Sequence, residues 1–133
     1  MKEQLLKGEK LLEFSKKLFT KYKKDIINLI EETTKKKFKY QRFKFMMEKG
    51  IDYWTVKQNK ILIGSESIKQ TKKVLGSIIH ELVHINTYNK LIKEYKIGNS
   101  KKIERWTVDK TNEIIKKINY KNKTNFKLQN YDK

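Results

Sequence analysis

Two histidines of the sequence, His80 and His84, flank Glu81 in the pattern H-E-x-x-H. On an α-helix, residues four apart lie about 40° apart around the axis and one turn along it, so both imidazoles point to one side. Two nitrogens placed in this way can bind one zinc ion at about 2.0–2.1 Å. Glu81 points beside them, within reach of a zinc-bound water. The pattern therefore predicts a hydrolytic zinc site, in which the metal lowers the pKa of the water and Glu81 takes its proton.

A pattern this short also arises by chance on amphipathic helices, about a few times in a thousand chains of this length. Here, however, both histidines of the 133-residue chain belong to the pattern. A histidine packed in a hydrophobic core would not explain why the two come as a pair around a glutamate. We therefore favour a zinc site over chance.

The third zinc ligand must be a carboxylate. A catalytic zinc has three protein ligands and one open position, and the chain has no cysteine and no third histidine. The helix expected after the motif carries three candidates, Glu104, Asp109 and Glu113. Asp109 has the shorter side chain and is better suited to accept a hydrogen bond from a ligand histidine, which would fix the tautomer of the ring. The alternative for each is an ordinary solvated carboxylate on a helix.

The segment around the motif resembles the active-site helix of the zincin metallopeptidases, in which uncharged residues surround the two histidines. The corresponding residues are Ile78, Ile79, Leu82, Val83 and Ile85. Asn86 departs from the longer family consensus, which usually has an apolar residue there. The resemblance extends over residues 51 to 118 and implies a zinc-dependent metallopeptidase that acts on a peptide or protein substrate. The short chain is similar to the minimal single-domain gluzincins, the minigluzincins.

The resemblance also bears on the third ligand. In gluzincins this ligand is a glutamate on the following helix, at about the distance that separates Glu104 from His84. Glu113 lies farther along and matches the longer spacing of peptidases that cleave phage repressors. The resemblance thus implies the ligands His80, His84 and Glu104, with Glu113 as the alternative.

A substrate-binding strand is a further implication of the resemblance. In zincins the strand before the active-site helix forms the upper rim of the cleft, and the substrate backbone adds to it as an extra strand. Residues 60–64 hold that position here, although they would also suit an ordinary hairpin strand. The expected substrate-binding residues are Ile61, Leu62, Ile63 and Gly64.

A donor to the oxyanion is also expected, and in zincins it is often a tyrosine or a histidine. Tyr88 lies one turn after His84 and is therefore the candidate catalytic donor. Tyr95 and Tyr120 are alternatives, and the sequence does not separate them.

The elements that would position these residues form a single α+β domain over residues 1–133, with a compact zincin-like fold and a small, mostly antiparallel sheet. The active-site helix is expected to begin near Ile68, because the sequence that starts at Ser67 fits a capping box. The expected elements are, in order, an N-terminal helix (2–34, with an interruption near Phe19-Thr20), a hairpin with its turn at Gln58-Asn59 (51–64), the motif helix (68–91), a glutamate-bearing helix (100–118) and an irregular polar tail (119–133).

Between the first helix and the hairpin, the segment from Lys35 to Phe45 interleaves aromatic and basic residues. Such a segment can form a platform on which nucleic-acid bases stack. It can also form short strands whose aromatic residues face the core, since Phe38 and Tyr40 alternate and Phe43 then continues in the opposite phase. A bulge or a turn would explain that change of phase. We favour the strands.

The net charge of +18 suggests a nucleic-acid partner. Only two of the 33 basic residues are arginines, however, whereas bidentate recognition of phosphate favours arginine. The absence of alanine and proline beside abundant lysine, isoleucine and asparagine indicates a coding bias, which favours a general lysine coat. The alternative to a peptidase is a nucleic-acid-associated regulatory protein with a zincin fold, either of the repressor-cleaving type or with a vestigial site.

The N-terminus lacks an apolar signal segment, and no run of 18 apolar residues exists. We therefore expect a cytoplasmic protein without a membrane span. Some minigluzincins are held latent, as zymogens, by their C-terminal segment. The resemblance thus raises the hypothesis that the tail fills the cleft here, with Asp132 or the terminal carboxylate near zinc.

Overall fold

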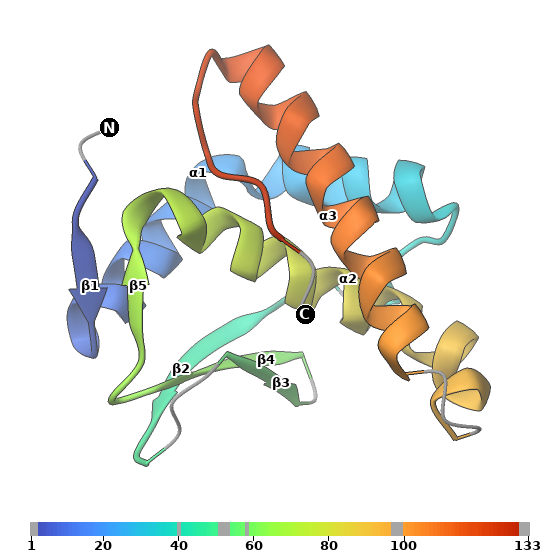
Figure 1. Cartoon of the computed structure of the whole chain (residues 1–133), viewed down its shortest axis with the longest axis horizontal. Helices are drawn as coiled ribbons and strands as arrows, with labels where there is room; N and C mark the ends of the chain where they lie inside the picture. The colour runs from blue at the N-terminus through green and yellow to red at the C-terminus, as the bar shows by residue number, and fades with distance from the viewer. Residues whose placement is uncertain (1–2, 40, 51–53, 58, 97–99, 131–133) are drawn as a thin grey trace.

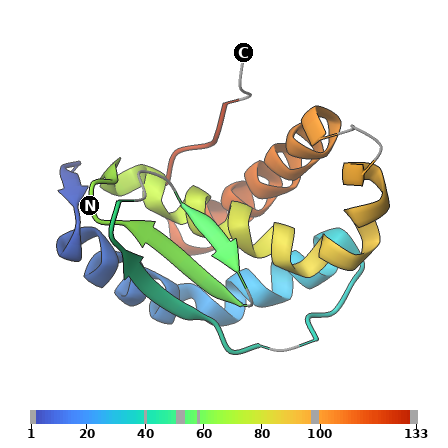
Figure 2. The same cartoon turned by 90° about the horizontal axis from the view of Figure 1, so that it is seen from below.

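The computed structural model describes residues 3–39, 41–50, 54–57, 59–96 and 100–130. Its elements are β1 (Leu5–Lys7), α1 (Glu9–Thr34), β2 (Lys44–Glu48), β3 (Thr55–Lys57), β4 (Lys60–Gly64), β5 (Ile68–Gln70), α2 (Thr71–Lys96) and α3 (Ser100–Asn122). The three helices pack against one another, and the sheet of β2, β4 and β3 packs against α1 and α2 (Figures 1 and 2). The α+β class expected from the sequence is confirmed.

The core is formed where α1 and α3 meet α2. Full burial of one large aliphatic side chain stabilises a fold by about 1.5–3 kcal/mol, so the contacts of α2 hold it firmly against both neighbours. Its fully buried residues are Val74, Leu75, Ile78, Ile79, Leu82 and Val83. The matching fully buried residues of α1 and α3 are Leu11, Ile26, Ile30, Ile114, Ile115 and Ile118. The middle of α2 is therefore a rigid platform for side chains on its remaining surface.

The first helix begins later than its apolar pattern predicts. Residues 5–7 form β1, which pairs antiparallel with β5, and α1 starts only at Glu9. Gly8 separates the two elements with a φ of 61°, a left-handed conformation that glycine adopts without strain. From Glu9 the helix continues without the expected interruption near Phe19, and it ends at Lys35, whose φ is 59°.

The expected start of the motif helix at Ile68 is wrong. Residues 68–70 form β5, and α2 begins at Thr71. The carboxylate of Glu3 accepts hydrogen bonds from the Thr71 hydroxyl and the Lys72 amide, both at 3.0 Å. The start of α2 is thus capped by a residue from the N-terminus and not by Ser67, because the pairing of β1 with β5 brings Glu3 there.

The expected hairpin is present, but its second strand is not an edge. β3 pairs antiparallel with β4, and Asn59 in the turn has a φ of 63°. β2 pairs with β4 on the other side, in parallel, so that β4 is the central strand. Lys60 to Leu62 are therefore paired on both sides, and Ile61 and Ile63 are fully buried. For Lys60 to Leu62 the expected open edge is therefore wrong, because the sequence did not reveal the parallel partner; Ile63 and Gly64 pair with β2 alone among the described residues.

Aromatic residues of the segment from Lys35 to Phe45 pack into the core as favoured, but the favoured strands are present only from Lys44 onward, in β2, and residues 36–39 and 41–43 are irregular. Phe43 contacts Phe38 and Phe19 edge-on, with ring centroids 5.3 and 6.0 Å apart. Phe45, in β2, lies 5.3 Å from Phe19, and both Phe38 and Phe45 are buried. Tyr40 lies outside the described residues. Because these rings pack against one another, they do not offer a surface on which nucleic-acid bases can stack.

After α3 the chain turns back and runs alongside α3 and across α2 (Figure 1). The irregular tail was expected from residue 119, but α3 continues to Asn122; residues 124–130 are irregular as expected, yet they are not a loose polar extension. Phe126 is only 4% exposed, and its ring meets that of Tyr22 edge-on at 5.6 Å. Asn119 holds this turn by hydrogen bonds to both backbone groups of Phe126, at 2.9 and 3.0 Å. The tail is therefore a packed part of the domain.

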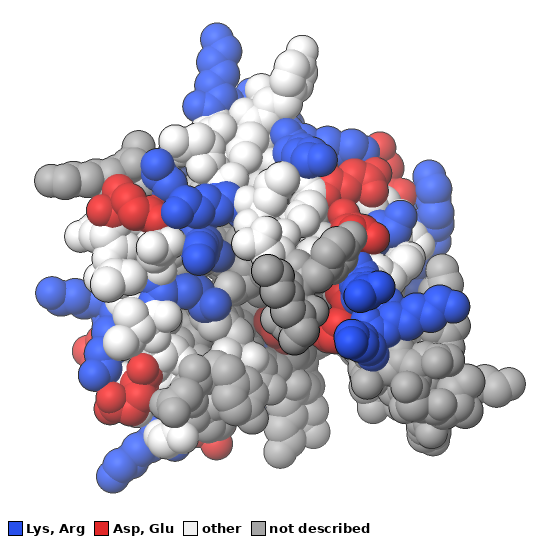
Figure 3. All heavy atoms as spheres, in the orientation of Figure 1, with Lys and Arg blue, Asp and Glu red and all other residues white. Residues whose placement is uncertain are grey.

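On the face seen in Figure 3, basic side chains are spread among uncharged and acidic ones and do not gather into one stripe. Over the described residues, no helix combines the length and the apolar character that crossing a membrane requires.

Candidate metal centre

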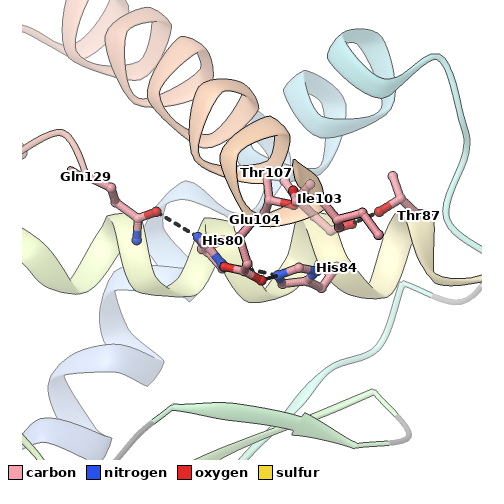
Figure 4. Close-up of polar contacts among 8 residues, drawn as sticks. His80, His84, Thr87, Ile103, Glu104, Thr107 and Gln129 are labelled. Carbon is pink, nitrogen blue, oxygen red and sulfur yellow. Dashed lines mark hydrogen bonds and ion pairs between the residues drawn. The ribbon is translucent and has the colours of Figure 1, made fainter. Parts of the chain in front are cut away.

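The two histidines of the motif lie one turn apart on the surface of α2, where α3 crosses it (Figure 4). Their Nε2 atoms are 3.2 Å apart, and their ring centroids are 4.9 Å apart. The side chains are 14% and 19% exposed, so each ring is held by its surroundings while one edge stays accessible. The opposite surface of the same helical turns is formed by the buried Ile78, Ile79 and Leu82. The i, i+4 spacing thus produces the paired imidazoles expected of it.

Glu104, in the first turns of α3, is the carboxylate that meets both imidazoles. Its Oε1 lies 2.8 Å from Nε2 of His84, and its Oε2 lies 3.1 Å from Nε2 of His80. The preceding residue, Ile103, is buried, and its carbonyl accepts a hydrogen bond of 2.8 Å from the Thr107 hydroxyl. Burial of Ile103 therefore holds the turn of α3 from which Glu104 reaches the two histidines.

The donor atoms of this cluster suit a tetrahedral metal ion. Ligands bound at about 2.0–2.1 Å in a tetrahedron lie about 3.3–3.4 Å from one another. In the cluster the two Nε2 atoms are 3.2 Å apart, and those of His80 and His84 lie 3.1 and 2.8 Å from the two different oxygens of Glu104. Two imidazole nitrogens and one carboxylate oxygen are also a donor set that zinc accepts in catalytic sites. The residues present therefore fit a zinc ion.

The electrostatics of the cluster follow from these contacts. Hydrogen bonds with His80 and then His84 hold the pKa of the Glu104 carboxyl far below its ordinary value, although partial burial opposes this. Burial acts to lower the pKa of His80, but the hydrogen bonds with Glu104 and Gln129 outweigh it and raise that pKa above its ordinary value. Glu104 is thus a permanent negative charge directed at two imidazoles, which favours binding of a cation between them.

Glu81 lies in a different environment on α2. Burial is the main effect and raises the pKa of its carboxyl, and the charge of Glu104 adds to the rise. The two imidazoles and Lys69 act in the opposite direction without cancelling it. A carboxyl with a raised pKa accepts a proton more readily, which is the property of a general base.

A lysine beside Glu81 is a feature that sequence reasoning missed. Lys69 belongs to β5, its ammonium lies 5.8 Å from the ring centroid of Trp54, and burial lowers its pKa while the charge of Glu81 raises it. Because Ile68 to Gln70 were expected to be helical, the sequence had no means of placing this cation beside the motif.

Gln129 is the second residue that sequence reasoning missed. Its side-chain Oε1 lies 2.7 Å from Nδ1 of His80, on the side of the ring opposite to Glu104 (Figure 4). The hydrogen bond to a ligand histidine that was expected of Asp109 is thus provided, for His80, by the tail. Asp109 itself is exposed on α3. No local sequence signal marks Gln129, because its position depends on how the tail folds back.

The remaining candidates lie away from the cluster or outside the described structure. Glu113 is on the outer side of α3 and forms ion pairs of 3.9 Å with Lys110 and Lys117. Tyr120 is 91% exposed. The side chains of Tyr88 and Tyr95, and the whole of Asp132, lie outside the described residues. The predicted roles of these last three remain predictions.

Asn86, the departure from the zincin consensus, has a structural role. It is 4% exposed, and its Nδ2 donates a hydrogen bond of 2.8 Å to the carbonyl of Lys36. The amide therefore ties α2 to the segment that follows α1, which an apolar residue could not do.

The chain matches no protein-family model, no curated protein and no solved structure. The function must accordingly be argued from the geometry and chemistry of its residues.

Proposed function

We propose that the protein is a zinc-dependent metallopeptidase. The observation that carries this proposal is the convergence of His80 and His84, whose Nε2 atoms are 3.2 Å apart, with the two carboxylate oxygens of Glu104, which lie 3.1 and 2.8 Å from them, beside the partly buried Glu81. A site that only held a structural metal would need four protein ligands, whereas three ligands leave a position open for water. Three donors with a carboxyl of raised pKa next to them form the arrangement that hydrolysis needs.

A zinc ion bound there would supply a water of lowered pKa and would polarise the carbonyl of a peptide. Glu81 takes the proton from the attacking water as the new bond to the carbonyl carbon forms. When the carbon–nitrogen bond breaks, Glu81 delivers that proton to the leaving amine. Burial of Glu81 suits both steps, because it keeps the affinity of the carboxylate for a proton high.

The sheet offers a different substrate edge from the one expected. β4 is central, whereas β3 pairs with β4 on one side only and contacts α2, the helix of the histidines. An extended peptide can add to such an edge through backbone hydrogen bonds. The proposal therefore places the substrate along residues 55–57. The net charge of +18 favours acidic over basic peptides.

The nucleic-acid alternative has less support. It rested on the net charge and on the aromatic segment, and the rings of Phe38, Phe43 and Phe45 pack against one another or against Phe19. The charge alone predicts weak binding that falls steeply with salt.

The proposal is tested by incubating the zinc-loaded protein with a library of acidic and basic peptides and identifying new termini by mass spectrometry. The matched variant is Glu81→Gln, which keeps the size of the side chain and removes its basicity. We expect cleavage by the native protein, a loss of about 10²–10⁴-fold in the variant, and one zinc ion per chain in both. Cleavage that survives in Glu81→Gln would reject the proposed base, and the absence of cleavage by a zinc-loaded native protein would reject the function.

A further inference from the structure

The tail that follows α3 reaches the candidate metal centre along a route defined by several contacts. Phe126 anchors it in the core, and the amide of Lys127 donates a hydrogen bond of 2.9 Å to the carbonyl of Lys72 in α2. These two contacts set the course of the chain just before Gln129. The tail is therefore fixed against the domain where it meets α2.

Gln129 is itself clamped at its backbone. Its amide donates to Oδ1 of Asn112 at 2.7 Å, and its carbonyl accepts from Nδ2 of the same side chain at 2.9 Å. One asparagine of α3 thus satisfies both backbone groups of one tail residue, in the way that a neighbouring strand would. With its backbone fixed by two hydrogen bonds, Gln129 has few orientations left for its side chain.

The side chain then crosses α2 at Gly76, where a Cβ atom would lie 3.4 Å from Cγ of Gln129 and 3.3 Å from Cδ1 of Ile115. A Cβ here would meet Gln129 at an ordinary contact distance, and the side chain of Ile115 would have to shift by a few tenths of an ångström. The glycine, which weakens a helix interior by about 1 kcal/mol relative to alanine, leaves the room through which the amide reaches His80. The amide oxygen ends 2.7 Å from Nδ1 of His80.

We propose that Gln129 is a positioning residue for the metal centre, which holds His80 in the ring orientation and tautomer that zinc binding needs. This inference rests on the proposed function. A histidine that binds zinc through Nε2 must carry its proton on Nδ1. An oxygen at 2.7 Å from Nδ1 accepts that proton in a hydrogen bond and leaves the lone pair of Nε2 directed at His84 and Glu104.

The two sides of the His80 ring are then held by different parts of the chain. Glu104 and His84 contact Nε2 of His80, and Gln129 contacts Nδ1 (Figure 4). Loss of such an outer partner typically lowers metal affinity by about 10–100-fold. The metal centre is therefore complete only when the tail is docked.

The experiment compares zinc affinity, measured by competition with a chelator, in the native chain and three variants. Gln129→Met keeps the length of the side chain and removes the acceptor. Gln129→Glu keeps an acceptor, and Asn130→Met makes the same amide-to-thioether change at the exposed neighbouring residue. We expect zinc affinity to fall by about 10–100-fold in Gln129→Met, and to stay near the native value in the other two.

A second measurement separates positioning from packing. In zinc-loaded, ¹⁵N-labelled native protein we expect a slowly exchanging Nδ1–H signal from His80, which should persist in Gln129→Glu and exchange rapidly in Gln129→Met. Equal zinc affinity in Gln129→Met and the native chain would overturn the inference while leaving the proposed function intact. Equal losses in Gln129→Met and Gln129→Glu would also overturn it, because the acceptor would then be irrelevant. If the native chain binds no zinc, the proposed function fails first, and the inference fails with it.

Discussion

The two sides of the candidate site, α2 and α3, contribute one glutamate each, and the two carboxyls lie in opposite environments. Glu104 of α3 is 44% exposed and touches both imidazoles, which lower its pKa. Glu81 of α2 is more buried and has a raised pKa, for which burial is the main cause. Where environments push the pKa values of two neighbouring carboxyls apart, one suits a permanent charge and the other suits proton transfer.

This difference assigns roles that the residue types alone do not. Both residues are glutamates within reach of the same histidines, so composition cannot separate a ligand from a base. Under the proposed function, contacts of 2.8–3.1 Å with both imidazoles suit Glu104 to the role of ligand. The raised pKa of Glu81, caused mainly by burial, suits it to the role of base.

The sharpest contrast comes from shortening each carboxylate by one methylene. A displacement of about 1 Å from a reacting atom can cost about 10²-fold in rate. We expect Glu81→Asp to lower kcat by about that factor with zinc affinity unchanged. We expect Glu104→Asp to weaken zinc binding, with much of the activity regained at saturating zinc. Parallel titrations of zinc and of activity measure both effects, and the same pattern in the two variants would erase the distinction between ligand and base.

The packing beneath Glu104 allows a smaller perturbation. Ile103→Val removes one buried methyl group and should lower the free energy of unfolding by about 0.5–1.5 kcal/mol. Ile118→Val makes the same change at a fully buried position near the other end of α3 and should cost about as much. Only Ile103→Val should also weaken zinc binding, because it loosens the turn that carries Glu104. Urea unfolding measures the stability and chelator competition measures the zinc affinity. Equal zinc affinities in Ile103→Val and Ile118→Val would mean that packing at Ile103 does not position Glu104.

Asp25 provides a carboxylate with a lowered pKa far from the histidines. Its Oδ1 lies 2.7 Å from Nζ of Lys121, and this hydrogen bond lowers the pKa of Asp25, against a smaller effect of burial. Because the folded pKa lies below the unfolded value of about 3.9, the pair stabilises the fold at higher pH and this contribution is lost as the pH falls through the folded pKa.

Asp25→Asn should therefore lower the free energy of unfolding by about 0.2–1 kcal/mol at neutral pH, with the difference from the native chain vanishing in strong acid. Zinc affinity should not change, since Asp25 joins α1 to the end of α3 and does not touch the site. Thermal unfolding across pH measures the first effect. A difference that stays constant down to strong acid would mean that the ion pair is not its cause.

Much of the site could be predicted from local sequence, because it depends on helical spacing. His80 and His84 needed only the periodicity of one helix, and the chain offered few carboxylates on the next one. Glu104 was nevertheless preferred to Glu113 as the third ligand because of the family resemblance, and no physical property of the sequence distinguished the two. The structure adds that Ile103 is buried and that Glu104, the next residue of α3, meets both histidines of α2.

The features that could not be predicted depend on partners distant in sequence. Ile68 to Gln70 form a strand only because Leu5 to Lys7 lie beside them. β4 is central only because β2 pairs with it in parallel. Gln129 meets His80 only because Asn112 and Phe126 direct the tail back over α2. In each case the local pattern permitted several structures, and a long-range contact selected one.

The most direct test of the account is the stoichiometry and affinity of zinc binding in the native chain, Glu104→Ala and Glu113→Ala. The two variants remove the same side chain from the same helix, and Glu113 forms ion pairs with the partly exposed Lys110 and Lys117. We predict one zinc ion per chain in the native protein and in Glu113→Ala, and a loss of tight binding in Glu104→Ala. Tight zinc binding that survives Glu104→Ala, or none in the native chain, would contradict the account.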